Sequence, residues 1–457
     1  RHPTQIARTN LALGMRQQVT PLDTSPLRSV SMANESGAVN DTYQLDSEVR
    51  VNEILLETAR RASAYLEGLD GRSVAPSKEA LTALERLGGP LPEEPTDPRT
   101  VLTLLDEVGS PATVASAGGR YYGFVVGGSL PAALAANWLA GAWDQNAGLA
   151  VMSPAAAAIE EIALGWLVDV LSLPRQTGGA FVTGATMANF TALAAARHAI
   201  LRRMGWDVEA QGLFDAPPVT VVVGEEVHVS LLKALSLLGL GRDRVLRVPA
   251  DNQGRMRAER LPELDESTIV CIQAGNVNTG ALDPAEEICA AARTAGAWVH
   301  VDGAFGLWLA AAPGRSHLVR GVAEADSWAT DAHKWLNVPY DSGMAFSRDP
   351  EHLRAAMSAS AAYLAPADAR EPCQYTPEMS RRARGVEIWA ALRALGRDGL
   401  ADLIERTCQH ASRFAEELRA AGYEILNDVV SNQVLVSFGD EAATRRVIAG
   451  VQADGTC

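Results

Sequence analysis

One lysine stands between an imidazole and an indole in the run Asp331–Trp335, directly after a short apolar segment that predicts a buried strand. A lysine is costly to bury, so one held in such surroundings usually has an electrostatic or covalent role. Burial lowers the pKa of an ammonium group, and the neutral amine is the form that condenses with an aldehyde. The segment alone is equally compatible with Lys334 extending from a strand end into solvent.

An aspartate follows a second predicted buried strand, Trp298–Val301. Ligands bind at the carboxyl ends of strands in an open α/β sheet, which is where Asp302 would lie. A carboxylate at this point can keep a pyridine nitrogen protonated, and the protonated pyridoxal ring then accepts electrons. The alternative is an aspartate that caps the next turn.

A glycine turn, a short strand and a small-residue turn precede a long alanine-rich helix between Thr177 and Arg203. The free amides at the start of that helix and the hydroxyl of Thr186 suit a phosphate group. Small residues here also permit a helix simply to pack tightly on a strand. The phosphate cradle, Asp302 and Lys334 nevertheless follow in the order that a fold-type I pyridoxal-phosphate enzyme requires, so we predict pyridoxal 5'-phosphate as cofactor.

At this point the chain resembles the group II pyridoxal-phosphate-dependent amino-acid decarboxylases, which include aromatic-L-amino-acid, tyrosine, glutamate and cysteine-sulfinate decarboxylases. The resemblance runs from about residue 45 to the C-terminus and is most specific in segments 226–234, 300–304 and 331–335. It implies that Lys334 is the Schiff-base lysine and that Asp302 is the partner of the pyridine nitrogen. It implies that His228 stacks on the cofactor ring and helps to position the substrate carboxylate. The full set of implied cofactor-binding residues is Ala185, Thr186, His228, Asn276, Asp302, Ala304, His333 and Lys334.

Two further segments are assigned through the resemblance. Gly118–Ser129 is rich in glycine and aromatic residues, and the family places part of the substrate pocket there, which makes Tyr121, Tyr122 and Phe124 substrate candidates. A loop of packed aromatics is an equally good interpretation of these residues. The proline-rich segment between Tyr363 and Met379 predicts a mobile surface loop. The family closes such a loop over the site, and Tyr375 is the candidate for the tyrosine that protonates the carbanion.

Two positions differ from the commonest family pattern. The turn 273–280 has asparagines and a valine where many relatives have threonines, and Asp331 replaces an asparagine of animal aromatic decarboxylases. The chemistry is unaffected, but these changes weaken any transfer of substrate specificity.

The pattern of strands and helices predicts an α/β fold with a mostly parallel seven-stranded sheet covered by helices on both faces. An N-terminal helical segment and a small C-terminal α+β domain flank it. We expect a disordered or non-native leader at 1–44 and an N-terminal helical segment for dimerisation at 45–115. A large cofactor-binding domain is expected at 116–350, and a small C-terminal domain, which we expect to be truncated, at 351–457. Predicted strands are 180–183, 219–223, 245–248, 269–272, 298–301, 327–329 and 343–346. Predicted flanking helices are 46–69, 100–108, 386–395 and 400–421, and short strands are predicted near 423–426 and 434–438.

Composition narrows the classes of partner. A net charge of −15 argues against nucleic acid or an anionic membrane, because both require a basic face. The cysteines are five in number, scattered and without CxxC spacing, which argues against a zinc site and a disulfide framework and favours a reducing cytoplasm. No apolar run reaches the length of about 20 residues that spans a bilayer. An amphipathic N-terminal helix needs a partner surface, and with the resemblance this predicts a homodimer.

Together these observations predict decarboxylation of an L-amino acid to an amine and CO2, with aromatic substrates slightly favoured. The alternatives on the same fold are an aldehyde synthase, another carbon–carbon lyase or an aminotransferase. A non-catalytic pyridoxal-phosphate-binding module is the least favoured, because the lysine, aspartate and histidine set is intact.

Overall fold

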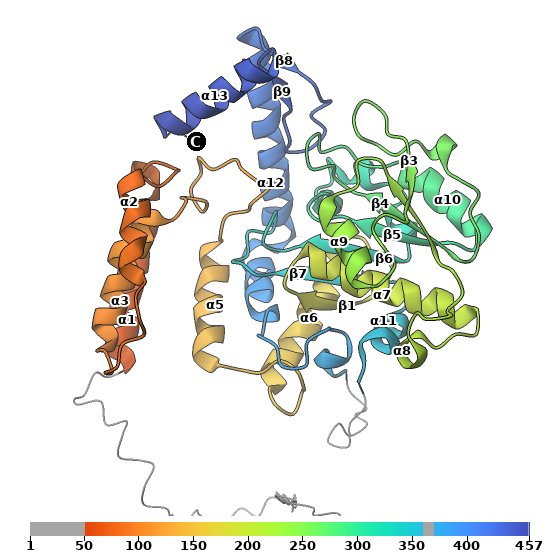
Figure 1. Cartoon of the computed structure of the whole chain (residues 1–457), viewed down its shortest axis with the longest axis horizontal. Coiled ribbons are helices and arrows are strands. Elements are labelled where there is room, and N and C mark those ends of the chain that lie inside the picture. The colour runs from red at the N-terminus through yellow and green to blue at the C-terminus, as the bar shows by residue number, and fades with distance from the viewer. Residues whose placement is uncertain (1–50, 360–369, 456) are drawn as a thin grey trace, which may run out of the picture.

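A seven-stranded sheet forms the centre of the computed structural model, which describes residues 51–359, 370–455 and 457 (Figure 1). The strand order is β1-β7-β6-β5-β4-β2-β3. Only β7 runs antiparallel to its neighbours, β1 and β6, and the other pairings are parallel. This confirms the predicted α/β fold. The strands are β1 Gly178–Val182, β2 Thr220–Gly224, β3 Leu246–Val248, β4 Thr268–Gln273, β5 Trp298–Asp302, β6 Ser327–Asp331 and β7 Gly343–Ser347.

Both faces of the sheet are buried, which explains why its strands read as continuous apolar runs. In β4, Ile269 and Cys271 pack on one face, with α7 (Ala185–Arg203) and α9 (Val229–Leu237). The alternate residues Val270 and Ile272 pack on the opposite face, with α6, α10 and α12. The helices on that second face are α6 Pro154–Val170, α10 Ala285–Ala295 and α12 Gly385–Ala420.

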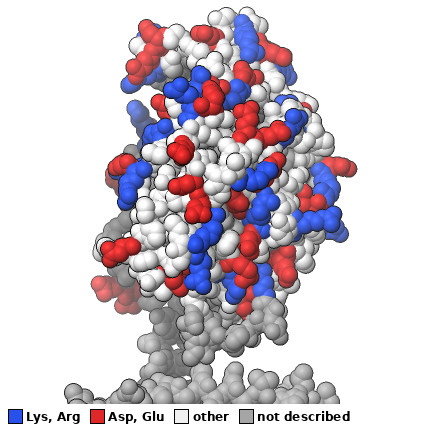
Figure 2. All heavy atoms as spheres, turned by 90° about the vertical axis from the view of Figure 1, so that its right-hand side faces the viewer, with Lys and Arg blue, Asp and Glu red and all other residues white. Residues whose placement is uncertain are grey.

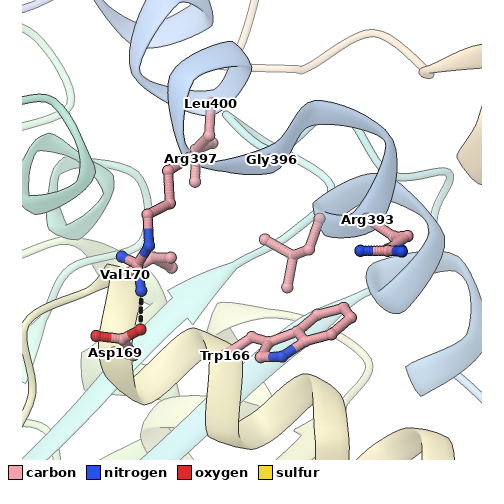
Figure 3. A pocket seen from close by; sticks show the side chains of 8 residues that line it. Trp166, Asp169, Val170, Arg393, Gly396, Arg397 and Leu400 are labelled. Carbon is pink, nitrogen blue, oxygen red and sulfur yellow. Dashed lines mark hydrogen bonds and ion pairs between the residues drawn. The ribbon is translucent and has the colours of Figure 1, made fainter.

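Glycine interrupts α12 where the sequence predicts a gap between two helices. Gly396 has φ 61° and ψ −172°, a left-handed φ that favours glycine. Arg397 follows the break and forms an ion pair with Asp169 of α6 (Figure 3). These residues line a cavity of about 310 Å³ with Trp166 and Arg393. None of the predicted site residues lies in this cavity.

The N-terminal helices form a group of their own, drawn in orange and set apart from the sheet in Figure 1. They are α1 Val51–Glu67, α2 Lys78–Ala83, α3 Pro98–Leu104 and α4 Ser110–Ala112. Arg61 of α1 binds Asp106 and Thr103, which ties the first helix to the third. The helix predicted at 100–108 begins earlier, at Pro98, because the Asp97 side chain caps the amides of Arg99 and Thr100. The predicted leader, 1–44, lies outside the described residues.

The C-terminal part holds a two-stranded sheet and a last helix. β8 (Glu424–Ile425) pairs with β9 (Val436–Ser437), close to the two predicted short strands. α13 (Glu441–Asp454) follows, and the Asp440 side chain caps it. The remaining helices are α5 Pro131–Trp143, α8 Val208–Gln211 and α11 Pro350–Met357. Short turns of 3-10 or π helix occupy Leu69–Gly71, Leu84–Leu87, Leu105–Gly109, Ala258–Arg260, Gly306–Ala311, Ser316–Val319, Val322–Glu324 and Pro372–Gln374.

Acidic and basic side chains are interspersed on the face shown in Figure 2. None of the described helices combines the length and apolar character that crossing a bilayer requires. Within the described part of the chain, no group of three or more His, Cys, Asp or Glu side chains is placed to hold a metal ion.

Candidate active site

A cavity of about 320 Å³ lies at the carboxyl ends of β1 and β6, the edge of the sheet where an α/β fold binds its ligands. It brings together residues that are far apart in the sequence, among them five of the predicted cofactor ligands. The lining residues are Thr183, Gly184, Ala185, Thr186, Met187, His228, Ser230, Asp331, His333 and Lys334.

Lys334 points its amine at a buried carboxylate. Its Nζ lies 3.0 Å from Oδ2 of Asp331, the last residue of β6, which is 1% exposed. The Lys334 side chain is 19% exposed, so the amine faces the cavity rather than bulk solvent. The ion pair with the buried Asp331 carboxylate therefore fixes the position of the Lys334 amine in the site.

His333 lies beside the same carboxylate. Its Nδ1 accepts a hydrogen bond of 3.2 Å from the backbone N–H of Ser342. In the neutral ring the proton is therefore on Nε2, which faces Oδ2 of Asp331 at 3.6 Å. Burial lowers the pKa of His333, and the nearby Asp331 opposes that shift. His333 can thus donate a hydrogen bond into the cavity.

The backbone of this segment is held by the glycine-rich stretch that precedes α5. The N–H of Gly127 donates to the carbonyl oxygen of His333 at 3.3 Å, and that of Leu130 donates to the carbonyl oxygen of Asn337 at 2.8 Å. A Cβ atom at Gly127 would overlap the carbonyl oxygens of His333 and Lys334. Only glycine permits this close approach, so Gly127 sets the position of the lysine segment.

The start of α7 supplies the second wall of the cavity. Gly343 lies against the backbone of Gly184, and a Cβ atom there would overlap it. This contact places the first turn of α7, with Ala185 and Thr186, at the cavity wall. The first amides of a helix have no acceptor within the helix, and they carry the positive end of its dipole. The predicted phosphate cradle therefore has the geometry of an anion site.

Asp302 ends β5 and is 4% exposed. Its Oδ2 accepts a hydrogen bond of 3.1 Å from Nδ2 of Asn189, and its Oδ1 accepts one of 3.2 Å from the N–H of Ala304. Burial raises the pKa of the Asp302 carboxyl, and the charge of Lys334 and the bond from Asn189 oppose this shift. Asn189 was missed from the sequence, where it is one polar residue in an alanine-rich helix.

His228 both caps a helix and lines the cavity. It is the N-cap of α9, where its Nδ1 contacts Oγ of Ser230 at 2.7 Å and accepts the Ser230 N–H at 3.3 Å. The same side chain lines the cavity and acts electrostatically on Asp302. Capping fixes the ring, and the fixed ring forms part of the cavity wall.

Other predicted residues do not line the cavity. Asn276 caps its own turn, where Oδ1 accepts the N–H groups of Asn278 and Thr279 at 2.9 Å and 3.2 Å. Tyr122 packs edge-on against Phe414, with ring centroids 5.3 Å apart. Phe124 is 93% exposed. For these positions the roles implied by the family resemblance stay predictions.

The described part of the segment predicted to be a mobile loop, residues 370–379, packs against α6 and β1, and its remainder, residues 363–369, lies outside the described residues. Arg370 forms an ion pair of 2.9 Å with Glu160 and donates to the carbonyl oxygen of Gly179 at 2.7 Å. Because Glu160 is 1% exposed, this contact anchors the segment to α6 and β1. Three of its residues are buried as a result: Pro372, Cys373 and Thr376.

Tyr375 lies with the anchored segment and outside the cavity. Its ring lies 4.4 Å from the guanidinium carbon of Arg370, and it packs beside Ala180 and Leu353. It is not among the cavity-lining residues. The phenol found beside the lysine segment is instead Tyr340, whose ring stacks on His333 with centroids 4.2 Å apart. Burial raises the pKa of Tyr340, and the nearby Asp331 and Tyr121 act in the same direction.

Comparison with known proteins decides the family. The pyridoxal-dependent decarboxylase conserved domain matches residues 119–439, which include the whole sheet and the cavity. The chain belongs to this family. Membership confirms the recognition made from the three sequence motifs, and it gives pyridoxal phosphate as the cofactor.

Individual relatives have different substrates in their names. The chain is 34% identical over 304 residues to L-2,4-diaminobutyrate decarboxylase of Rhizobium meliloti, covering 64% of this chain and 59% of that one. It is 26% identical to L-tyrosine/L-DOPA decarboxylase 2 of Lophophora williamsii, covering 90% of this chain and 78% of that one. The crystal structure of Oryza sativa TDC with PLP and tryptamine has a TM-score of 0.80 at 23% identity, with 91% of each chain covered. The chain thus spans less than two thirds of the Rhizobium protein, and the structural likeness shows the fold.

The residues present fit pyridoxal phosphate. Two buried polar atoms near the cavity, Oδ1 of Asp331 and Oγ of Ser342, have no hydrogen-bond partner among the described residues. The start of α7 offers amides to a phosphate, Lys334 offers an amine, and Asp302 offers a buried carboxylate. The phosphate, the aldehyde and the ring nitrogen of the cofactor therefore each have a matching group in this chain.

Proposed function

We propose that this protein is a pyridoxal-phosphate-dependent decarboxylase that converts an L-amino acid to the corresponding amine and CO2. The observation that supports this most is the convergence of Lys334, His228 and the start of α7 on one cavity of about 320 Å³, with Asp302 buried beside them. Membership of the decarboxylase family supports the same reaction.

Different residues of the chain would bind different parts of the cofactor. The amides at the start of α7, the Thr186 hydroxyl and Nε2–H of His333 would bind the phosphate. Lys334 would bind the aldehyde carbon and release it to the substrate amine. Asp302 would hold a proton on the ring nitrogen, and His228 would pack on the ring. When bound, the cofactor supplies an electron sink for the pair left by the broken Cα–carboxylate bond.

Proton return to the substrate Cα requires an acid close to Lys334. The Lys334 amine itself is in the cavity, and Asp331, 3.0 Å away, would stabilise its charged form between proton transfers. Tyr375 is the acid that the family resemblance implies, and in this chain it would first have to leave Arg370. We therefore propose Lys334 as the proton donor when Tyr375 stays in place.

For the substrate we propose an aromatic L-amino acid. Tyr340 stacks on His333, Tyr121 lies near Tyr340, and both rings offer apolar surface with a polar tip. Two relatives are named for L-2,4-diaminobutyrate and for L-tyrosine or L-DOPA, so both kinds of substrate should be compared. Rates with L-tyrosine, L-tryptophan, L-2,4-diaminobutyrate and L-aspartate decide between them, and a preference for either of the last two would contradict the aromatic assignment.

For the assembly we propose a homodimer. The N-terminal helices and α5 expose large apolar side chains, which a partner surface would cover. These are Val51, Leu55, Leu56, Val101, Leu105, Trp138, Leu139 and Trp143. Sedimentation at micromolar protein should give twice the mass of one chain, and an active monomer would contradict the proposal.

The cysteines are free in the structure, and we propose the reducing cytoplasm as the compartment.

The reaction is tested by giving the purified protein a substrate labelled at the carboxyl carbon. We expect labelled CO2 and the amine in equal amounts. Release of labelled CO2 with aldehyde and peroxide in place of amine would point to the aldehyde synthase alternative. Transfer of the amino group to an oxo acid, with no CO2, would identify an aminotransferase. Lys334→Ala is the matched control, because it removes one side chain from the cavity.

A further inference from the structure

Four buried side chains form one hydrogen-bonded path that ends on Asp302. The Trp298 indole Nε1–H donates to Oγ of Ser327 at 2.9 Å, and that oxygen lies 2.9 Å from Nδ1 of His300. Nε2 of His300 lies 2.8 Å from Oδ1 of Asn189, whose Nδ2 donates to Asp302 at 3.1 Å. Ser327, His300 and Asn189 are 0% exposed, so no solvent competes for these bonds.

The path comes from three elements that the fold fixes against one another. Trp298 and His300 lie on β5, Ser327 lies on β6, and Asn189 lies on α7. His300 and Ser327 are direct partners in the parallel pairing of β5 with β6. Asp302 points to the same face of β5 as His300, because side chains alternate along a strand. The pairing of the sheet and the packing of α7 thus set every distance in the path.

The direction of the bonds follows from the chemistry of the two ends. An indole N–H can only donate, so Oγ of Ser327 accepts from Trp298 and its own proton is free for Nδ1 of His300. A neutral His300 then carries its proton on Nε2 and donates to Oδ1 of Asn189. The amide of Asn189 in turn directs its N–H at Asp302. Each group donates toward the carboxylate, which is the arrangement that an ionised acceptor favours.

The reverse direction of the path is unfavourable at its Ser327 end. A protonated Asp302 would donate to the Asn189 oxygen, and the amide would donate to His300. Nδ1–H of His300 would then donate to Ser327, whose oxygen already accepts from Trp298. The Ser327 hydroxyl proton would be buried without an acceptor among the described residues, which is costly.

We propose that Ser327, His300 and Asn189 are positioning residues that orient Asp302 and hold its carboxylate ionised toward the ring nitrogen of the cofactor. This inference rests on the proposed function and extends it to residues that touch neither substrate nor cofactor. The groups outside the path that act on Asp302 are Lys334, His228, Asp331 and the buried thiol of Cys271. Burial keeps His300 neutral by lowering its pKa to about 3, as a donor on this path must be.

Two substitutions interrupt the path with little change of shape. Ser327→Ala removes one oxygen and leaves His300 Nδ1 without its donor. Asn189→Leu is close in size and removes the bond to Asp302. Thr191→Val is the matched control for the second, because Thr191 lies on α7, is 0% exposed and has a hydroxyl without a hydrogen-bond partner among the described residues.

The first readout is independent of turnover. In the full-length protein labelled with 15N-histidine, His300 should stay neutral with its proton on Nε2 between about pH 6 and about pH 9. Ser327→Ala should convert that signal to a mixture of the two tautomers, while Thr191→Val should leave it unchanged. A wild-type His300 with its proton on Nδ1, or one that titrates in this range, would overturn the proposal.

The second readout concerns the bound cofactor. In Asn189→Leu the pH at which the cofactor absorption reports loss of the ring-nitrogen proton should fall by about one unit, and kcat should fall about tenfold, with KM nearly unchanged. Wild-type absorption and kcat in both Asn189→Leu and Ser327→Ala would overturn the proposal. If the wild-type protein binds no pyridoxal phosphate, the proposed function fails, and the His300 signal then shows separately whether the path exists.

Discussion

His300 makes a prediction about stability that needs neither substrate nor cofactor. The ring is 0% exposed, and burial lowers its pKa from 6.5 to about 3. In the unfolded chain the same ring binds a proton at its ordinary pKa. Between these two values the unfolded state binds more protons than the folded state, so the free energy of unfolding increases with pH. The contribution of the buried, neutral His300 to the free energy of unfolding is fully present above about pH 6.5 and is lost progressively as the pH falls toward 3.

The magnitude follows from the same pair of pKa values. A shift of one pKa unit corresponds to about 1.4 kcal/mol, so between about pH 6 and pH 5 this one histidine should remove roughly 1 kcal/mol of unfolding free energy. That is a large share of the net stability of a typical protein, which is about 5–15 kcal/mol. Other groups titrate in the same range, so the effect of His300 must be isolated by difference.

The measurement is urea unfolding of wild-type protein and of His300→Gln at several pH values. Glutamine does not titrate, so the slope of unfolding free energy against pH should be smaller in the variant by roughly 1 kcal/mol per pH unit below about pH 6. His410→Gln removes an exposed histidine of α12 and serves as the control, which should keep the wild-type slope. Equal slopes in wild type and His300→Gln would show that His300 is not held neutral by burial.

Three further predictions concern the cavity. Asp302→Asn should retain the cofactor yet lose about a hundredfold or more in kcat, because a neutral pyridine is a poor electron sink, and near-wild-type turnover would remove Asp302 from this role. Gly127→Ala should lower kcat about tenfold or more by displacing the Lys334 segment, whereas Gly71→Ala, with no atom within 4 Å of the added Cβ, should have no effect. Because Tyr375 packs against Arg370 outside the cavity, Tyr375→Phe should leave the rate of amine formation unchanged, and slower amine formation with aldehyde and peroxide would show that Tyr375 is the acid. An unchanged rate in Tyr375→Phe together with a loss in Tyr340→Phe would identify Tyr340 as the proton donor.

The sheet was predictable because of how burial acts on strands. β4 is buried along its whole length, and its four central residues, 269–272, read as one apolar run, while the polar residues that follow such strands mark one edge of the sheet. This logic placed Asp302 and Lys334 correctly at the carboxyl ends of β5 and β6. The break in α12 was also predictable, because Gly396 interrupts the helical pattern.

The contacts around these residues were not predictable from the sequence. Asn189 reaches Asp302 only because α7 packs on β5, and nothing in an alanine-rich helix indicates that contact. The segment around Tyr375 reads as a loop because its own residues are polar and proline-rich. Its anchor is the ion pair of Arg370 with Glu160, a residue 210 positions away in the sequence. Pairs this distant depend on tertiary packing rather than on local pattern.

The most direct test of the central claim uses the small number of lysines in this chain. There are three, Lys78, Lys233 and Lys334, and the structure exposes the first two. The purified protein is incubated with pyridoxal phosphate, reduced with borohydride and digested, and the labelled peptide is identified by mass. We expect the label on Lys334 alone, with no label in Lys334→Ala and full labelling in Lys233→Arg. A label on Lys78 or Lys233, or a reducible cofactor that persists in Lys334→Ala, would contradict the assignment of the active site.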